Sequence, residues 1–217
     1  MNVLMEFIHG FRRLHFVGPC VTFFGSARFE ENHPIYHSTR ALAGAVAELG
    51  FTVMTGGGAG LMEAANRGAK DVGGRSVGCN ISLPSPQAVN RYLDKWVTIR
   101  YFFIRKTLLI KYSFAFIVLP GGFGTLDEFF EAVTLTQTKK ILQFPIIIFD
   151  RAFHEELLRH LDHMIEAGTI SREDLELIVV ADEIPVIIDF LRRQSIEKFL
   201  LQPEVKRLPR QWLFEKA

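Results

Sequence analysis

The segment Pro120-Gly121-Gly122-Phe123-Gly124-Thr125 places three glycines within four residues, directly after the apolar run Phe114–Leu119. Because glycine has no Cβ, backbone N–H groups in such a turn can approach a ligand closely. A helix is expected from Leu126 to Lys140, and the first N–H groups of a helix lack internal partners and carry the positive end of its dipole. The turn is therefore predicted to bind an anion, most naturally a phosphate, and the alternative is a tight turn that needs glycine for geometry alone.

A second glycine cluster, Gly56-Gly57-Gly58-Ala59-Gly60, follows the apolar run Phe51–Met54 and precedes a helix expected over Leu61–Asp71. Its glycines are contiguous rather than spaced as in the dinucleotide-binding fingerprint, and no lysine follows them as in a Walker loop. A ligand loop and a close helix–strand contact explain it equally well. Ser26, which follows the strand expected at Val21–Phe24, can likewise contact a ligand or close a turn.

Glu128 is the candidate chemical group, because it lies within one helical turn of the predicted phosphate. A carboxylate at that place can stabilise positive charge on a sugar ring or activate water, as in glycoside hydrolysis. Thr125-x-x-Glu128 also matches a capping box, in which the glutamate only bonds back to the start of its helix, and the residues alone favour that interpretation. Asp127 and Glu131 are alternative carboxylates, of which Asp127 suits a first-turn partner of the helix dipole.

Arg105 and Lys106 interrupt an otherwise apolar and aromatic helix expected over Phe102–Tyr112. Adjacent residues of a helix diverge by about 100°, so the two side chains cannot serve one solvent face equally. An arginine that lines a cleft needs an anionic partner, and its planar guanidinium suits a phosphate or a carboxylate. A functional role is therefore favoured over a surface position. Gln87 and Asn90 lie in a loop that could reach over the same site.

Composition and charge limit the class of protein. The 217 residues, 48% of them hydrophobic, suit a single globular domain. With 25 basic and 24 acidic residues the net charge is +1, which gives no support to a nucleic-acid partner. The longest apolar run is far shorter than the roughly 20 residues that cross a bilayer, and residues 1–10 do not resemble a secretory signal. The expectation is a cytoplasmic protein without a membrane partner.

No metal site is predicted. Cys20 and Cys79 lie in apolar, strand-like runs and are expected to be buried thiols rather than disulfide partners or metal ligands. His154, His160 and His163 share one expected helix without a companion cluster of ligands, and they are expected to be solvated.

Strand-length apolar runs alternate with helix-length amphipathic segments along the chain. Strands are expected at 21–24, 51–54, 76–81, 96–99, 114–119, 146–149 and 177–180, and helices at 34–49, 61–71, 102–112, 126–140 and 153–167. This alternation predicts an α/β fold, a Rossmann-like, doubly wound, mostly parallel sheet with helices on both faces. Ligands of such sheets bind beyond the carboxyl ends of the strands, where the strand order switches. The expected division is an N-terminal extension (1–18), one nucleotide-binding catalytic domain (19–194) and a C-terminal helix and tail (195–217).

The segments Gly56–Met62, Arg105-Lys106 and Pro120–Glu128 resemble the LONELY GUY (LOG) family in order and spacing, and the last of them is highly specific. The resemblance extends roughly from Pro19 to Asp182. Members are Rossmann-like homo-oligomers, commonly dimers, that hydrolyse the N-glycosidic bond of cytokinin riboside 5′-monophosphates, and often of AMP, to free base and ribose 5-phosphate. The resemblance thus implies a small-molecule nucleoside monophosphate as substrate and a homo-oligomer, most often a dimer.

By motif position the resemblance implies Arg105 and Glu128 as the catalytic pair. The predicted substrate-binding residues come from the strand ends, the two glycine clusters and the motif positions: Ser26, Gly57, Gly58, Gln87, Lys106, Gly121, Gly122, Phe123, Gly124, Thr125, Leu126, Asp127 and Thr134. The chain departs from the family pattern at Phe103, where many members have a histidine. It also departs in the loop 83–94, which bears on base preference.

The LOG family is also described as lysine decarboxylase-like. Such an enzyme would hold pyridoxal phosphate through a lysine Schiff base, and no lysine of this sequence follows a strand beside an obvious pyridinium partner. No cofactor is therefore expected. The alternative function is a module of the same fold that senses a nucleotide or carries a cofactor without cleaving it, with Glu128 only capping its helix.

Overall fold

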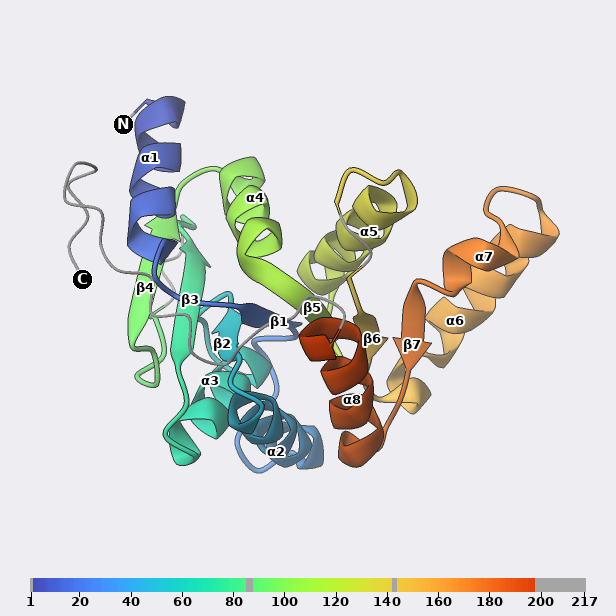
Figure 1. Cartoon of the computed structure of the whole chain (residues 1–217), viewed down its shortest axis with the longest axis horizontal. Helices are drawn as coiled ribbons and strands as arrows, with labels where there is room; N and C mark the ends of the chain where they lie inside the picture. Colours follow the sequence, from blue (N-terminus) through green and yellow to red (C-terminus); the bar gives the residue numbers. More distant parts are fainter. Residues whose placement is uncertain (1, 85–87, 142–143, 198–217) are drawn as a thin grey trace.

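The computed structural model describes residues 2–84, 88–141 and 144–197, the last three by their backbone alone. Within these residues the fold is built on a seven-stranded sheet in the order β4-β3-β2-β1-β5-β6-β7 (Figure 1). All described strand pairs are parallel, which confirms the predicted Rossmann-like α/β fold. The strands are β1 (Cys20–Phe24), β2 (Thr52–Thr55), β3 (Ser76–Ile81), β4 (Lys95–Ile99), β5 (Ser113–Val118), β6 (Ile146–Ile148) and β7 (Ile178–Val180).

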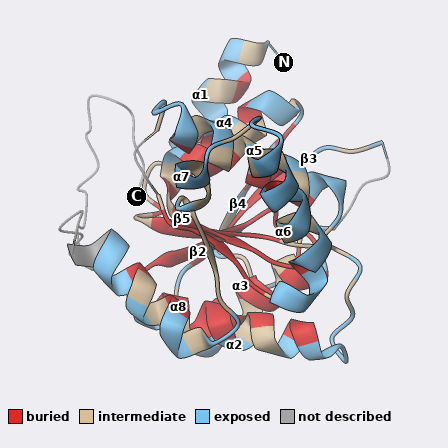
Figure 2. Ribbon diagram, turned by 90° about the vertical axis from the view of Figure 1, so that its right-hand side faces the viewer, coloured by how far each residue is buried: buried red, intermediate tan, exposed pale blue. Residues whose placement is uncertain are grey.

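Helices cover both faces of the sheet, because a parallel strand pair needs a crossover connection. One face is covered by α2 (Pro34–Glu48), α3 (Leu61–Asp71) and α8 (Ile184–Leu191). The other is covered by α1 (Val3–Leu14), α4 (Phe102–Tyr112), α5 (Phe123–Gln137) and α6 (Arg151–Glu166). Figure 2 shows the buried strands between these two layers, whose outer surfaces are exposed. The short helix α7 (Arg172–Leu175) precedes β7.

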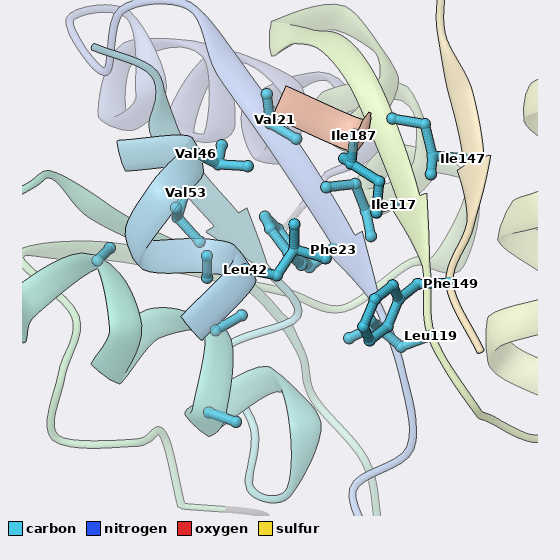
Figure 3. Close-up of a cluster of buried hydrophobic side chains, with 14 of the residues drawn as sticks. Val21, Phe23, Leu42, Val46, Val53, Ile117, Leu119, Ile147, Phe149 and Ile187 are labelled. Carbon is cyan, nitrogen blue, oxygen red and sulfur yellow. The ribbon is translucent and has the colours of Figure 1, made fainter. Parts of the chain in front are cut away.

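The central strands carry the core, which explains their unbroken apolar sequence. On the face of α2, side chains from β1, β2 and β5 pack against Leu42 and Val46 (Figure 3). Burying one such aliphatic or aromatic side chain contributes about 1.5–3 kcal/mol. Cys20 and Cys79 are buried on the opposite face and are free thiols, as expected.

The strand order switches direction beside β1. This strand pairs with β2 on one side and with β5 on the other, so the chain runs out through β4 and returns to β5. Ser26 and both glycine clusters follow the carboxyl ends of β1, β2 and β5. They therefore lie at the switch point, where ligands of doubly wound sheets bind. Residues 56–60 are called the β2 loop below, and residues 120–125 the β5 turn.

Several helix boundaries differ from the predictions. Helix α5 begins at Phe123 rather than Leu126, so the β5 turn runs directly into the helix. Helices α1, α7 and α8 were not predicted, and α1 packs Leu14 into the core on the α4 face. After α8, Arg192–Glu197 forms a π-helical turn, and the rest of the predicted tail lies outside the described residues. No helix in the described part of the chain is long and apolar enough to cross a membrane.

The prediction that three histidines of α6 are solvated is wrong for His154. Its side chain is buried, and its Nδ1 lies 2.9 Å from the carbonyl oxygen of Asp150. The reason is that His154 lies seven residues before Leu161, the other buried residue of α6, so that both are on the helix face that packs against the protein. His160 and His163 are exposed.

Candidate active site

Ser26 joins the three strand ends that form the candidate site. Its backbone N–H donates to the carbonyl oxygen of Pro120 at 3.0 Å, and its own carbonyl accepts from Leu61 N–H at 2.9 Å. The Ser26 hydroxyl accepts from the backbone N–H of Arg28 at 3.1 Å. Ser26 thus closes a turn and holds the β5 turn next to the start of α3; contact with a ligand stays a prediction.

The β2 loop is fixed by buried side chains. Thr55 Oγ1 accepts from Gly57 N–H at 2.8 Å and donates to Asn66 Oδ1 at 2.6 Å. Asn90 Nδ2 donates to the carbonyl oxygen of Gly58 and to Asn66 Oδ1, both at 2.9 Å. Because Gly57 and Gly58 are buried and their backbone groups bond within the protein, their observed role is structural. Asn66, which sequence reasoning missed, could have been noticed as a polar residue in an alanine-rich helix.

The middle of the β5 turn is exposed, although its end residues Pro120 and Thr125 are buried. Gly122 is the N-cap of α5 and has a φ of −101°, and Gly122, Phe123 and Gly124 are all exposed. A Cβ added at Gly122 or Gly124 would meet nothing within 4 Å among the described residues. The fold therefore does not require glycine at either position. An open, side-chain-free helix start is the geometry that an anion site needs.

Glu128 and Arg105 form a buried ion pair beside the β5 turn. Arg105 Nη1 donates to Glu128 Oε1 at 2.9 Å, and Arg105 Nε donates to the carbonyl oxygen of Cys79 at 2.9 Å. The Glu128 side chain is 4% exposed, and its Oε2 has no hydrogen-bond partner among the residues that the structure describes. A Cβ at Gly56 would lie 2.7 Å from Arg105 Nη2, so this glycine makes room for the guanidinium.

The capping-box interpretation of Glu128 is wrong. Because α5 begins at Phe123 with Gly122 as N-cap, Thr125 is the third residue of the helix and Glu128 the sixth. A capping box needs a hydroxyl at the N-cap and a carboxylate three residues later. The Thr125 side chain instead packs across Gly121, where a Cβ would overlap it. Glu128 is therefore free of a capping role and directed at Arg105.

Comparison with known proteins identifies the family. Residues 62–191 match a family described as "Possible lysine decarboxylase". The cytokinin riboside 5′-monophosphate phosphoribohydrolase of Mycobacterium tuberculosis is 34% identical over 146 residues, which cover 64% of this chain and 76% of that protein. The enzyme of the same name, LOG2, from Arabidopsis thaliana is 31% identical over 165 residues, 74% of this chain and 76% of its own length. The chain belongs to the LOG family.

Solved structures place the LOG-family chain in the same fold group. A molybdenum cofactor binding protein from Rippkaea orientalis is 22% identical, with a TM-score of 0.59, over 85% of this chain and 98% of that one. The molybdenum cofactor carrier protein of Chlamydomonas reinhardtii is 22% identical, with a TM-score of 0.57, over 82% and 98% of the two chains. At this level of identity, the likeness describes the fold.

Burial sets the proton affinity of the glutamate in this LOG-family site. Loss of hydration raises the pKa of Glu128 to about 7, against the opposing effect of Arg105 and Lys106, while Glu131 and Asp127 add to the rise. A carboxyl group with this pKa exchanges its proton near neutral pH. Such a group can both accept a proton from water and, when ionised, stabilise a nearby positive charge.

Lys106 lies between two carboxylates of α5. Its Nζ is 2.8 Å from Asp127 Oδ2 and 2.8 Å from Glu131 Oε2. Burial acts to lower the pKa of Lys106, but the contacts with Asp127 and Glu131 outweigh it, and the pKa lies above its ordinary value. A Schiff base needs a neutral amine, so this lysine is poorly suited to the chemistry that the decarboxylase description suggests.

The remaining predicted residues fall into three groups. Leu126 is half-buried on α5 beside Asp127. Phe123 is 95% exposed and Thr134 is exposed further along the same helix. Gln87 lies outside the described residues. The structure thus brings Arg105, Lys106 and Glu128 together next to the β5 turn, whereas Gly57 and Gly58 are buried within the β2 loop.

Proposed function

We propose that this protein hydrolyses the N-glycosidic bond of a purine nucleoside 5′-monophosphate, releasing the free base and ribose 5-phosphate. The observation that carries the proposal is the buried Arg105–Glu128 pair directly behind an exposed glycine turn at the start of α5. The names of the relatives from Mycobacterium tuberculosis and Arabidopsis thaliana support the same reaction.

The phosphate group binds at the β5 turn. Gly122 and Gly124 leave space for its oxygens, and the unpaired N–H groups of the first turn of α5 donate to them. This placement brings the ribose toward Glu128, which lies further along the same helix.

In the chemical step the bond between C1′ and the base nitrogen breaks, and its electron pair leaves with the base. The ribose becomes oxocarbenium-like, and the ionised carboxylate of Glu128 stabilises that charge and orients the attacking water. The water hydroxyl joins C1′, and the water proton balances the charge of the departing base. Arg105 keeps the carboxylate oriented through the bond to Oε1.

Release of adenine from AMP tests this proposal. Turnover by Glu128→Gln is expected to fall by about 10²–10⁴-fold with AMP binding retained, because the variant keeps the shape and loses the charge. The matched control is Glu155→Gln, which alters an exposed glutamate of α6 and is expected to keep full turnover. Unchanged turnover in Glu128→Gln would contradict the mechanism. Binding of AMP by the wild type without release of base would favour the non-catalytic nucleotide or cofactor module.

A homodimer is part of the proposal. Four phenylalanines on α4 and α5 are exposed, and large exposed apolar side chains are candidates for an interface between subunits; they are Phe102, Phe103, Phe123 and Phe130. Sedimentation equilibrium at micromolar concentration is expected to give twice the chain mass, and a monomer would contradict the dimer. A cytoplasmic location stays a prediction.

A further inference from the structure

We propose that Lys106 is a positioning residue that clamps α4 onto α5 through Asp127 and Glu131 and so holds Arg105 against Glu128. The family resemblance places Lys106 beside the phosphate, whereas its contacts here are carboxylates. The catalytic meaning of the clamp rests on the proposed function.

The clamp is a ladder of ion pairs between two helices. Neighbouring residues of α4, Arg105 and Lys106, pair with neighbouring residues of α5, Glu128 and Asp127, at 2.9 and 2.8 Å. Glu131 lies one helical turn after Asp127 and therefore on the same side of α5, which lets one ammonium group contact both at 2.8 Å. The Lys106 side chain is only 16% exposed, so the contact is partly shielded from water.

The net charge of these ion pairs affects how readily Glu128 ionises. The ladder holds two cations and three carboxylates, so it is neutral when Glu128 carries a proton and has one negative charge when it does not. From β3, Cys79 adds no charge, because burial raises the pKa of its thiol to about 12. Lys106 therefore offsets one of the two negative charges of Asp127 and Glu131, and together with Arg105 it favours the ionised form of Glu128.

A lysine that bound the phosphate would leave these carboxylates. Asp127 and Glu131 would then stand without their cation next to Glu128 and near the negative substrate. The geometry instead keeps the lysine on α5 and leaves the phosphate to the backbone of the β5 turn. The two roles predict different kinetic consequences when the lysine is removed.

The test is the pH dependence of kcat and KM for AMP in the full chain. In Lys106→Met the limb on which kcat rises with pH is expected to move upward by roughly one pH unit, with KM changed less than about threefold. Adding Asp127→Asn should move the limb back, because it removes one of the uncompensated carboxylates. Lys106→Arg keeps the charge and both contacts and should restore the wild-type profile.

Carboxyl ¹³C NMR measures the pKa of Glu128 directly, so this part of the test does not depend on turnover. The Glu128 signal is assigned as the one that is absent from the spectrum of Glu128→Gln. A higher pKa in Lys106→Met supports the clamp even if no nucleotide is hydrolysed, so that failure of the proposed function is separately visible. An unshifted Glu128 titration together with a tenfold or larger rise in KM would assign Lys106 to the phosphate and overturn the proposal. An unshifted titration with unchanged KM would overturn it as well.

Discussion

The β2 loop and the β5 turn carry the same sequence signal, a run of glycines between a buried strand and a helix, yet their structures differ. In the β2 loop, Gly60 has a φ of +65°, and a Cβ there would lie 2.5 Å from the carbonyl oxygen of Ser26. In the β5 turn, Gly122 and Gly124 have room for a Cβ and no positive φ. The β2 loop needs glycine at position 60 to fold, and the β5 turn needs it at Gly121, where a Cβ would overlap Thr125, but not at Gly122 or Gly124.

The difference indicates that the β2 loop supports the fold and that the β5 turn is available to bind a ligand. Thr55, Asn66 and Asn90 satisfy the backbone of the β2 loop from within the protein. The β5 turn ends in an exposed helix start that has no side-chain cap in the described structure. A glycine that the fold does not need is best explained by a ligand that needs its space. Substitutions in the two regions should therefore act on different quantities.

The largest effect on stability is expected from Gly60→Ala. Gly60 has a φ of +65° and a ψ of −131°, a conformation open almost only to glycine that costs another residue about 1–3 kcal/mol, and the overlap with Ser26 adds about 1–3 kcal/mol. Urea unfolding should show a loss of about 2–6 kcal/mol in the free energy of unfolding. A loss below about 1 kcal/mol would mean that the β2 loop does not need its glycine, and the comparison would fail.

Replacing Glu128, which follows the β5 turn on α5, should change how the free energy of unfolding depends on pH. The pKa of Glu128 is about 7 in the folded protein and lies near 4.5 when the chain is unfolded. Between these pH values the folded state binds more protons, so this residue makes stability fall as pH rises. Relative to wild type, Glu128→Gln should gain roughly 3 kcal/mol in the free energy of unfolding between pH 4 and pH 8. Equal pH dependence in the two proteins would show that the carboxyl group is not buried as described.

Loss of the Asn90 side chain, which bonds to the β2 loop, should lower the free energy of unfolding by a smaller amount. Asn90→Ala removes the bonds to Gly58 and Asn66 and leaves buried polar groups unpaired, at a cost of about 2 kcal/mol. Its KM for AMP, measured at a temperature where the variant is folded, should stay close to that of the wild type. An increase in KM without loss of stability would instead place Asn90 in contact with the substrate.

Gly122→Ala should change stability least. With nothing within 4 Å of the added methyl group, the free energy of unfolding should stay within about 0.5 kcal/mol of wild type. The methyl group would occupy space proposed for a phosphate oxygen, so KM for AMP should rise roughly tenfold, equivalent to about 1.4 kcal/mol. A variant that is destabilised and binds AMP normally would show that the β5 turn, too, is only structural.

Much of the fold could be predicted from the sequence because strand burial leaves a continuous apolar pattern. The run 114–119 and its neighbours correspond to β5 and the strands beside it within one or two residues. Helix α1 was not predicted, although Val3, Phe7, Phe11 and Leu14 recur at helical spacing and pack on the core; the burial of Gly10 and Glu6 beside them does not follow from that pattern. Both residues are explained only by tertiary contacts: Gly10 with Leu108 of α4, and the Glu6 carboxylate with the backbone N–H of Arg100.

The sequence singled out Arg105, Lys106 and Glu128, which the structure brings together, but it could not show which of them contact one another. Spacing placed Glu128 near a helix start, but whether it capped that helix depended on where α5 begins, a matter of three residues that local sequence does not resolve. Likewise the neighbours Arg105 and Lys106 look alike in the sequence. Only the packing of α4 against α5 assigns the arginine to Glu128 and the lysine to Asp127 and Glu131.

The central claim is that the β5 turn binds the phosphate of a nucleotide that Glu128 then cleaves. The most direct measurement compares kcat/KM for AMP and for adenosine, followed as free adenine with one preparation of the wild-type protein. A preference for AMP of at least about a hundredfold, equivalent to roughly 3 kcal/mol of binding energy from the phosphate, is predicted. Equal values for the two substrates would contradict the role of the glycine turn.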